Sequence, residues 1–493
     1  MSLDTTHGPY TGLAQQFIAG QWRDGASGRR LVDTAPYDGA ALGEFALVSQ
    51  ADVDAAYAAA DKAQKLWAAT LPAERTALME RVLAVLEARG EEIISWIIRE
   101  SGSTRLKATI ELNSAKAIVA ESATFPNRLE GKLLASAIPA QESRVYRAPL
   151  GVVGVISPWN FPFHLSMRSV APALALGNAV VLKPASDTPI AGGTLLGRIF
   201  EEAGAPAGLV NVTVGAGSEI GDHFVDHPVP RFISFTGSTG VGRRVGALAT
   251  GGRWIKRVAL ELGGNAPLVV LEDADLEAAA AAACFGRFLH QGQICMSTNR
   301  VIVVDTVHDD FVAALKPKVE ALVVGDPDSF GTAIGPIINA AQYASVTGKL
   351  AQAKADGAKV LVGADPSGNV VPPQLLVDVD PDWEIAKDET FGPILPVIRA
   401  RDEDHALELA NASEFGLSSA VFTRDHSRGL RFAQGIVAGM CHINDITVDD
   451  QVNAPFGGEK NSGLGRFNGD WAIEEFTRAQ WVTIQHTPRH FPF

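Results

Sequence analysis

Short apolar runs rich in valine and isoleucine recur in this chain, and they limit the folds that it can adopt. Between residues 151 and 271 the runs are GVVGVIS, NAVVLK, LVNVTV, RFISF and PLVVL, each bounded by Gly, Pro, Asn or Asp. Runs of this length without polar alternation are typical of strands that are buried on both faces of a sheet. Because helical segments separate them, the pattern predicts parallel strands in βαβ units.

A second alternating series begins after about residue 265. It comprises the helical run LEAAAAAACFGRFLHQ, then RVIVVD and GPILPVI, and then the helical run DHALELANAS. This series predicts a second α/β domain. The length agrees with this prediction. A chain of 493 residues is longer than one typical hydrophobic core can accommodate, so two or three domains are expected.

Three further segments lie outside these series. The stretch from 51 to 101 predicts two helices: the first opens after Ser49, and the second covers residues 72–101. Residues 132–149 and 476–486 alternate as strands do, but they belong to neither α/β series. They can form surface hairpins, or they can form a sheet that pairs with another subunit.

Composition excludes several classes of protein. Three cysteines without a CxxC pair give no disulfide framework and suit a reducing compartment. No HExxH or Cys/His cluster occurs, so we predict no metal site. A net charge of −14 argues against nucleic acid as a partner. The first residues lack the pattern of a signal peptide, and no apolar run reaches the roughly 18 residues of a membrane span. We therefore expect a cytoplasmic protein that binds no membrane.

One cysteine stands among polar residues, in FLHQGQICMSTNR at 288–300. A free thiol is only a few per cent thiolate at neutral pH, so a nucleophilic Cys295 needs help from its surroundings. A pair with His290 would indicate a hydrolase, but a spacing of five does not place both side chains on one helical face. Cys284 and Cys441 lie in apolar runs, and we expect both to be inert core residues.

Polar residues follow three of the predicted strands. Asn160 lies on a proline-flanked turn in SPWNFPFHLS, where it either satisfies its own turn or faces a ligand at a strand end. Lys183 ends a buried strand, so its side chain either reaches the surface or points into a crevice. The glycine-rich FTGSTGVG at 235–242 precedes a helix expected to begin near Val241. Such a turn can hold phosphate, although the G-x-G-x-x-G pattern is absent.

Acidic residues occupy two further positions of interest. Glu261 lies inside the apolar stretch VALELGGNAPLVVL, where burial would raise its pKa and suit it to act as a general base. Alternatively, Glu261 pairs with the nearby Lys256 or Arg257. Glu389 and Phe391, in KDETFGPILPV, can bind ribose hydroxyls and flank a ring, or they can belong to an ordinary acidic turn.

Taken in order, these motifs resemble those of the aldehyde dehydrogenase superfamily. They are PWN at 158–160, KP at 183–184, FTGST at 235–239, LELGGN at 260–265, GQIC at 292–295, ETFGP at 389–393 and PFGGEKNSGLGR at 455–466. The resemblance extends from about residue 16 to the end of the chain. It implies an α/β fold with a Rossmann-like NAD(P)-binding domain (10–126 and 150–262) and an α/β catalytic domain (263–463). It also implies a small oligomerisation sheet (127–149 and 476–493) and a homodimer or homotetramer.

The resemblance also implies a mechanism. Cys295 would attack an aldehyde to give a thiohemiacetal, whose oxyanion the Asn160 amide and the Cys295 backbone N–H would hold. After hydride transfer to the nicotinamide, Glu261 would activate the water that hydrolyses the thioester. The residues implied to bind the cofactor are Ile156, Pro158, Trp159, Lys183, Ser186, Gly237, Ser238, Leu262, Glu389 and Phe391.

Three positions depart from common family patterns. Ser186 stands where strictly NAD-selective members often have Glu, so either NAD or NADP is expected as cofactor. Phe467 replaces a frequent Glu after the C-terminal motif, which removes a second water-activating acid and places more weight on Glu261. Ser297 replaces Ala or Gly two residues after the cysteine, and we expect this change to be tolerated.

The substrate expectation is an aromatic aldehyde. The segment from Trp159 to Pro189, GRF at 465–467 and the ending RHFPF resemble the benzaldehyde, salicylaldehyde and vanillin dehydrogenase branch. The residues expected to line the substrate tunnel are Phe161, Leu165, Arg168, Ile294 and Met296. Arg168 would serve a ring hydroxyl or carboxylate, or make a structural salt bridge. An aliphatic or semialdehyde substrate, a coenzyme A-acylating enzyme and a noncatalytic NAD-binding protein remain the alternatives.

Overall fold

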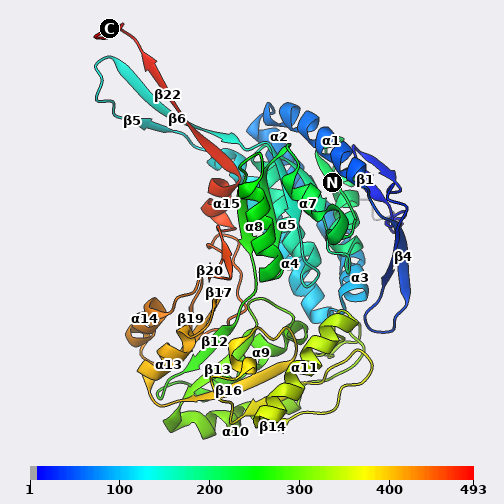
Figure 1. Ribbon diagram of the computed structural model, residues 1–493, viewed down its shortest axis with the longest axis vertical. Helices are drawn as coiled ribbons and strands as arrows, with labels where there is room; N and C mark the ends of the chain where they lie inside the picture. The colour runs from blue at the N-terminus through cyan, green and yellow to red at the C-terminus, as the bar shows by residue number, and fades with distance from the viewer. Residues whose placement is uncertain (1–7) are drawn as a thin grey trace.

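A computed structural model describes residues 8–493, in which an eight-stranded sheet forms the upper body in Figure 1. Its middle strands are parallel and match four of the predicted apolar runs. In spatial order the strands are β2 (Gln21–Arg23), β1 (Gln16–Ile18), β9 (Val210–Val212), β8 (Ala179–Lys183), β7 (Val152–Ile156), β10 (Pro230–Thr236), β11 (Arg257–Glu261) and β21 (Gly463–Leu464). The prediction of parallel strands in this part of the chain is confirmed.

Helices cover this sheet and supply most of its core. They are α1 (Gln50–Ala68), α2 (Pro72–Ala88), α3 (Gly90–Ser101), α4 (Arg105–Arg128), α5 (Pro162–Ala175), α6 (Leu195–Glu202), α7 (Gly217–Asp226) and α8 (Thr239–Gly251), with a short π-helix at Ile190–Thr194. Helix α1 opens as predicted, because Ser49 accepts a hydrogen bond from the Asp52 N–H while the Asp52 carboxylate accepts one from the Ser49 N–H.

The prediction of one helix over residues 72–101 is wrong. Helix α2 ends at Ala88 and α3 begins at Gly90, because Arg89 leaves helical geometry with φ −110° and ψ 17°. Its guanidinium bonds Glu202 of α6 at 2.7 Å and Glu92 at 3.1 Å. This break lets α3 turn away from α2, so the apolar periodicity continues along the sequence although the helix axis changes. The helix expected near Val241 begins at Thr239.

A seven-stranded sheet forms the lower body in Figure 1. Its order is β14 (Lys359–Val362), β15 (Gln374–Val377), β16 (Ile394–Ala400), β13 (Thr298–Val304), β12 (Ala266–Val270), β18 (Ala420–Phe422) and β19 (His442–Ile443). The larger helices around it are α9 (Leu276–Phe288), α10 (His308–Glu320), α11 (Ala340–Asp356), α13 (Glu403–Asn411) and α14 (His426–Gly435).

Successive residues of this second sheet enter two separate cores. Val269 of β12 packs into one apolar cluster, whereas its neighbours Leu268 and Val270 pack into another. Both faces are therefore buried, which explains why these strands are apolar throughout instead of alternating. The predicted second α/β series is confirmed.

The two strand-like segments outside both series pair with each other. Strand β22 (Thr477–Gln485) lies beside β6 (Gln141–Pro149), and β6 also pairs with β5 (Lys132–Leu134). The resulting three-stranded sheet projects from the body, with the C-terminus near its tip (Figure 1). Within residues 8–493, no helix is long and apolar enough to cross a membrane.

The two large sheets face each other through opposite strand ends. The eight-stranded sheet contributes the carboxyl ends of β7, β10 and β11, which are followed by Asn160, Ser238 and Gly263. The seven-stranded sheet contributes the loops before β13 and β16, which carry Cys295 and Glu389. Loops from both bodies therefore meet at one place, and this is where the candidate site lies.

Candidate active site

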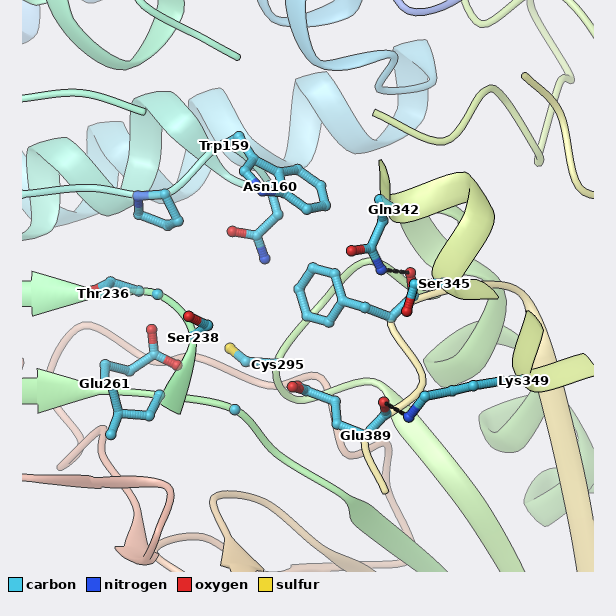
Figure 2. A pocket seen from close by; sticks show the side chains of 15 residues that line it. Trp159, Asn160, Thr236, Ser238, Glu261, Cys295, Gln342, Ser345, Lys349 and Glu389 are labelled. Atoms are coloured by element: carbon cyan, nitrogen blue, oxygen red, sulfur yellow. Dashed lines mark hydrogen bonds between the residues drawn. The ribbon is translucent and has the colours of Figure 1, made fainter. Parts of the chain in front are cut away.

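Two cavities meet at Cys295. One, of about 280 Å³, lies against the eight-stranded sheet, and the other, of about 270 Å³, lies between α5, the end of α9 and the loop around Val448. Asn160 and Cys295 line both cavities. Figure 2 shows the Asn160 amide above the Cys295 thiol, with Glu261 and Glu389 on either side of it. A group held in one cavity can therefore react with a group held in the other at this thiol.

Cys295 reaches this position through a sharp reversal after α9. His290, Gln291 and Gly292 all have left-handed backbone angles, with φ of 51°, 56° and 72°. Such angles cost roughly 1–3 kcal/mol at non-glycine residues and persist only where neighbours hold them. The Gln291 amide does so, because it donates to the Gly102 carbonyl at 3.1 Å and to the Pro336 carbonyl at 2.8 Å.

His290 forms no pair with the cysteine. Its ring is buried and meets Phe161 edge-on, with ring centroids 6.0 Å apart. Neither ring nitrogen has a hydrogen-bond partner within residues 8–493. The Cys295 thiol faces the Glu261 carboxylate instead. The Cys–His arrangement of a hydrolase is therefore absent from the described part of the chain.

A buried guanidinium joins the cysteine loop to the Glu389 loop. Arg287, at the end of α9, donates to the Thr390 carbonyl at 2.7 Å, to the Gly392 carbonyl, and to the Asn299 side chain at 3.0 Å. Asn299 in turn accepts from the Thr390 N–H and donates to Asn265 at 2.6 Å. These contacts fix the segments of Cys295, Glu389 and Asn265 to one another. They also explain why Asn299 stands four residues after the cysteine. Sequence reasoning missed Arg287, since nothing marks it apart from an ordinary helix-end arginine.

Two glycines after Glu261 permit a close approach of these loops. A Cβ on Gly264 would lie 2.2 Å from the Cys295 carbonyl oxygen, and a Cβ on Gly263 would lie 2.6 Å from the Glu389 carboxylate. The Gly264 N–H also donates to Glu389 at 2.8 Å. Glycine is therefore required at both positions by the packing of neighbouring loops rather than by an unusual φ.

Glu261 is buried at the end of β11 with 1% of its surface exposed. Burial raises the pKa of this carboxyl, and the positive charge of Arg168 opposes the rise. The Cys295 pKa is also raised, by burial and then by the neighbouring Glu261 charge. At rest the cysteine is therefore a thiol, and the carboxylate beside it is a group that can accept its proton.

The alternative partners considered for Glu261 are wrong. The Lys256 ammonium donates to the Val225 carbonyl at 2.5 Å, and Arg257 donates to the Thr477 carbonyl at 2.7 Å. Both residues lie at the opposite end of β11 from Glu261, so neither can reach its carboxylate. The partner is Arg168, at 3.4 Å.

Asn160 is fixed by a buried ion pair below it. Its Nδ2 donates to the Gln293 carbonyl at 3.0 Å, which leaves the second amide hydrogen free. The backbone carbonyl of Asn160 accepts a hydrogen bond from the Lys107 ammonium at 2.6 Å, and Lys107 pairs with the Glu111 carboxylate at 2.5 Å. Glu111 also accepts the N–H groups of Phe163 and His164, which caps the first turn of α5. Only the Lys–Glu spacing of four residues, within an otherwise buried helix face, could have signalled this pair.

Most of the residues expected to bind a cofactor surround the first cavity. Its lining includes Pro158, Trp159, Gly237, Ser238, Leu262, Glu389 and Phe391 from the expected set, and also Thr236, Gly263, Gln342, Ser345 and Lys349, which sequence reasoning missed. Two of these residues, both on α11, hold the Glu389 loop beside the cavity (Figure 2). Gln342 donates to the Phe391 carbonyl, and Lys349 donates to the Glu389 carbonyl. Burial raises the pKa of Glu389 to about 7.

Ile156, Lys183 and Ser186 do not line this cavity. Lys183 is buried, so the alternative in which it reaches the surface is wrong. Its ammonium lies 3.4 Å from the Pro184 carbonyl, and burial lowers its pKa to about 8. A lysine this poorly satisfied fits a site that gains a hydrogen-bond partner when a ligand enters.

The second cavity contains the five residues expected to line a substrate tunnel, namely Phe161, Leu165, Arg168, Ile294 and Met296. The residues that sequence reasoning missed are Ile110, Ser114, His164, Phe285, Leu289, Ile446, Val448, Asp449, Asp450 and Phe456. They come from α4, α5, α9 with the turn after it, and residues 446–456, which are far apart in sequence, so no local motif marks them. The walls are mainly apolar, which suits a ring or an aliphatic chain.

The other cysteines and the serine near the nucleophile have structural surroundings. Cys284 is buried, and burial raises its pKa to about 11. Cys441 is only partly buried, which corrects the expectation of a core position, although burial raises its pKa too. Ser297 donates to the Gly286 carbonyl at 3.0 Å and thereby satisfies the end of α9.

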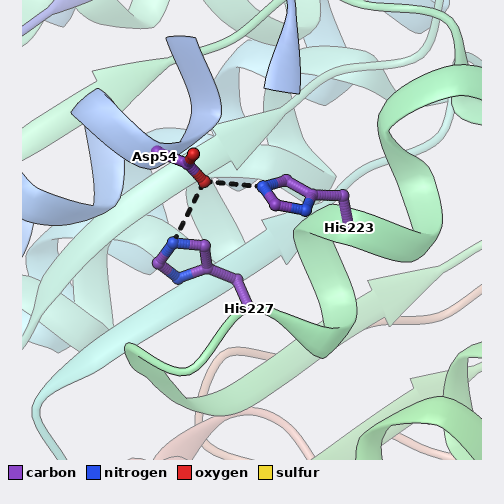
Figure 3. A group of neighbouring side chains, drawn as sticks. All are labelled: Asp54, His223 and His227. Carbon is purple, nitrogen blue, oxygen red and sulfur yellow. Dashed lines mark hydrogen bonds and ion pairs between the residues drawn. The ribbon is translucent and has the colours of Figure 1, made fainter. Parts of the chain in front are cut away.

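One cluster with metal-ligating side chains lies on the surface between α1 and α7, formed by Asp54, His223 and His227 (Figure 3). Asp54 lies 2.6 Å from His223 Nε2 and 3.3 Å from His227 Nε2. The Val229 N–H donates to His227 Nδ1, so the proton of the neutral ring lies on Nε2 and faces Asp54. The cluster is thus explained as a carboxylate that accepts two imidazole N–H groups.

The sequence pattern of the aldehyde dehydrogenase family matches residues 22–482. The chain belongs to the aldehyde dehydrogenase family. It is 57% identical to a vanillin dehydrogenase of Corynebacterium glutamicum over 473 residues, which cover 96% of this chain and 98% of that protein. The predicted family, α/β fold class and aldehyde dehydrogenase activity are confirmed.

Solved aldehyde dehydrogenases superpose on nearly the whole chain. An NAD-dependent benzaldehyde dehydrogenase from Corynebacterium glutamicum has 52% identity and a TM-score of 0.90, covering 100% of this chain and 99% of its own. A salicylaldehyde dehydrogenase from Pseudomonas putida G7, solved with salicylaldehyde, has 37% identity and a TM-score of 0.94, covering 97% of this chain and 99% of its own.

Replacing Gly264 by alanine tests the close approach of the loops in this aldehyde dehydrogenase. The added Cβ must displace the Cys295 carbonyl, and a shift of about 1 Å at a reacting group can lower the rate about 10²-fold. We expect Gly264→Ala to fold and to lose aldehyde oxidation by that order, as measured by kcat/KM and circular dichroism. Gly221→Ala, in an open position on α7, is the matched control and should retain full activity. Equal activity of the two variants would contradict the packing argument.

Proposed function

We propose that this enzyme oxidises an aromatic aldehyde to the carboxylic acid, with NAD as its cofactor. The observation that carries the proposal is the meeting of two cavities at Asn160 and Cys295. The apolar wall of the second cavity supports a ring as substrate, as do the relatives described as vanillin, benzaldehyde and salicylaldehyde dehydrogenases. The NAD-dependent relative supports the choice of cofactor.

In the first step the Cys295 sulfur attacks the aldehyde carbon. The C–S bond forms as the thiol proton passes to the Glu261 carboxylate that it faces. The free amide hydrogen of Asn160 and the Cys295 backbone N–H stabilise the oxyanion of the resulting thiohemiacetal. Loss of one such donor typically costs about 3–4 kcal/mol of barrier.

The residues around the first cavity fit a nicotinamide dinucleotide. Ser238 is the N-cap of α8 but makes no side-chain capping bond, so the first-turn N–H groups are available to a pyrophosphate. Glu389 in the cavity wall and Lys183 beyond it would bind ribose hydroxyls. Pro158, Trp159, Gly237, Leu262 and Phe391 of the wall, with Ile156 and Ser186 beyond it, would surround the remainder. A nicotinamide held there would supply the two-electron oxidation, as hydride acceptor, that converts the thiohemiacetal into a thioester on Cys295.

Hydrolysis of the thioester completes the reaction. Before this step Glu261 releases the thiol proton to solvent. It then takes a proton from water as the water oxygen attacks the thioester carbonyl, and it passes that proton to the Cys295 sulfur as the C–S bond breaks, which releases the acid and restores the thiol. Asn160 again holds the oxyanion. The presence of Glu261 disfavours transfer of the acyl group to coenzyme A, since that branch usually lacks the base. Asn160, Glu261 and Cys295 together disfavour a noncatalytic role.

Steady-state reduction of NAD and NADP with benzaldehyde, vanillin and a short aliphatic aldehyde tests this proposal. We expect aromatic aldehydes to be turned over at least tenfold faster in kcat/KM than the aliphatic one, with NAD preferred. Cys295→Ala should retain its fold and lose activity. A preference for the aliphatic aldehyde or for NADP would contradict that part of the proposal, and full activity of Cys295→Ala would contradict the mechanism.

We further propose a division of the chain and a cytoplasmic homo-oligomer. Residues 10–126 and 150–262 would form the cofactor domain, 263–463 the catalytic domain, and 127–149 with 476–493 the oligomerisation segment. The projecting sheet exposes Leu133 and Trp481 by 83% and 68%, which supports its burial by another subunit. The three free cysteines suit a reducing compartment.

Sedimentation velocity can test the oligomer. We expect the wild type to sediment as a dimer or tetramer, and the double variant Leu133→Glu with Trp481→Glu to shift toward smaller species because charge is placed in an apolar contact. Leu66→Glu, at a similarly exposed position on α1, is the matched control and should sediment as the wild type does. A monomeric wild type, or no shift in the double variant, would overturn the proposed interface.

A further inference from the structure

Arg168 lies in the wall between the two cavities, and its guanidinium is almost completely buried. The side chain has 1% of its surface exposed, and its Nη2 lies 3.4 Å from Glu261 Oε2 and 3.5 Å from the Thr236 hydroxyl. Its Nη1 lies 3.9 Å from Asp450, on the 446–454 loop. An isolated charge so deeply buried would be very costly, so these carboxylates are needed to hold it.

Two aromatic rings fix the guanidinium in this position. Its central carbon lies 4.3 Å from the centre of the Phe456 ring and 4.6 Å from that of Phe467. The two phenylalanines pair through their backbones, with Phe467 N–H donating to the Phe456 carbonyl at 2.8 Å and the reverse bond at 3.1 Å. Phe467 thus has a role at the position where many family members have Glu: it holds Arg168 without competing for its charge.

The two oxygens of Glu261 differ in their contacts. Oε2 is the one that Arg168 holds, whereas Oε1 has no hydrogen-bond partner within residues 8–493 although it is buried. A carboxylate anchored through one oxygen presents the other to a proton donor in a fixed direction. This is the arrangement that a general base for a bound water requires.

We propose that Arg168 is the positioning residue of the general base: it orients Glu261 and keeps it ionised for hydrolysis of the thioester. This inference rests on the proposed function, because it assigns Glu261 as the base. Because Phe467 stands where many family members have a second acid, Arg168 supplies the charged contact to Glu261 in this enzyme. Its contact with Asp450 connects the base to the loop that lines the substrate cavity.

The charges around Glu261 determine the direction in which each substitution should move its pKa. Arg168 lowers the pKa of Glu261, while Asp450 raises it, and the carboxylate of Glu389 and the thiol of Cys295 also face this region. Asp450 itself contacts His164 at 3.1 Å and Asn468 at 2.6 Å. A base works only when ionised, so the rate of hydrolysis falls at low pH as Glu261 takes up a proton; this fall is the acid limb of the pH profile. Removal of Arg168 should shift the acid limb to higher pH. Removal of the Asp450 charge should shift it to lower pH.

The test measures hydrolysis of the acyl-enzyme itself. Wild type, Arg168→Met, Arg168→Lys and Asp450→Asn are reacted for one turnover with NAD and benzaldehyde, and loss of the acyl group is followed from pH 5 to 9 by rapid quench and intact mass. We expect the acid limb of Arg168→Met to rise by about one pH unit or more, that of Arg168→Lys to rise less, and that of Asp450→Asn to fall. Acylation with 4-nitrophenyl benzoate gives the same comparison without cofactor.

Several outcomes overturn the proposal. Unchanged acid limbs in folded Arg168→Met and Asp450→Asn would reduce Arg168 to a packing role. A limb that disappears in His164→Gln would assign the titration to that imidazole. A raised KM for hydroxylated benzaldehydes alone, with the limb in place, would make Arg168 a substrate contact. If Arg168→Met does not fold, the opposite shifts of Arg168→Lys and Asp450→Asn still decide. A wild type that oxidises no aldehyde would instead overturn the proposed function.

Discussion

The contact between Gly264 and the carbonyl oxygen of Cys295 is the constraint on which the rest of the site depends. The eight-stranded sheet carries Glu261 at the end of β11 and Asn160 and Ser238 on the loops that follow its strands, while the seven-stranded sheet begins from loops that carry Cys295 and Glu389. These groups can share one site only if the loops touch without a side chain between them. Gly263 and Gly264 provide that contact, and the hydrogen bonds of Arg287 and Asn299 then hold the loops in register.

Burial around this contact sets the electrostatics of the site. Glu261, Glu389, Lys183 and Cys295 all have pKa values displaced toward their neutral forms by burial. Such displacement disfavours two charged groups side by side at rest and favours transfer of a proton between them. Arg168 is the fixed positive charge beside Glu261, and the rings of Phe456 and Phe467 keep it there. The residues that tune the base therefore lie on the C-terminal motif and on α5, away from the base in sequence.

Much of the fold could be predicted from local patterns. The runs before Asn160, Lys183 and Ser238 are apolar throughout because both faces of their strands are buried, and the structure has strands there. The break at Arg89 could not be predicted, since it depends on a tertiary contact with Glu202 and not on local propensity. The motif residues of both cavities could be named from sequence, and the structure brings most of them together. Lys107, Arg287 and Lys349 could not, because each acts through a backbone carbonyl far away in the sequence.

The central claim is that Cys295 carries the acyl group between the two cavities. It is tested most directly by trapping that group on Glu261→Gln protein mixed with NAD and benzaldehyde at alkaline pH, where the thiol can lose its proton to hydroxide without the carboxylate, followed by mass spectrometry of its peptides. The account predicts one benzoyl group on the peptide that contains Cys295, and none on the peptides of Cys284 and Cys441. It also predicts that the group forms only when NAD and the aldehyde are both present. An unmodified Cys295 peptide in protein that has nevertheless reduced one equivalent of NAD would contradict it.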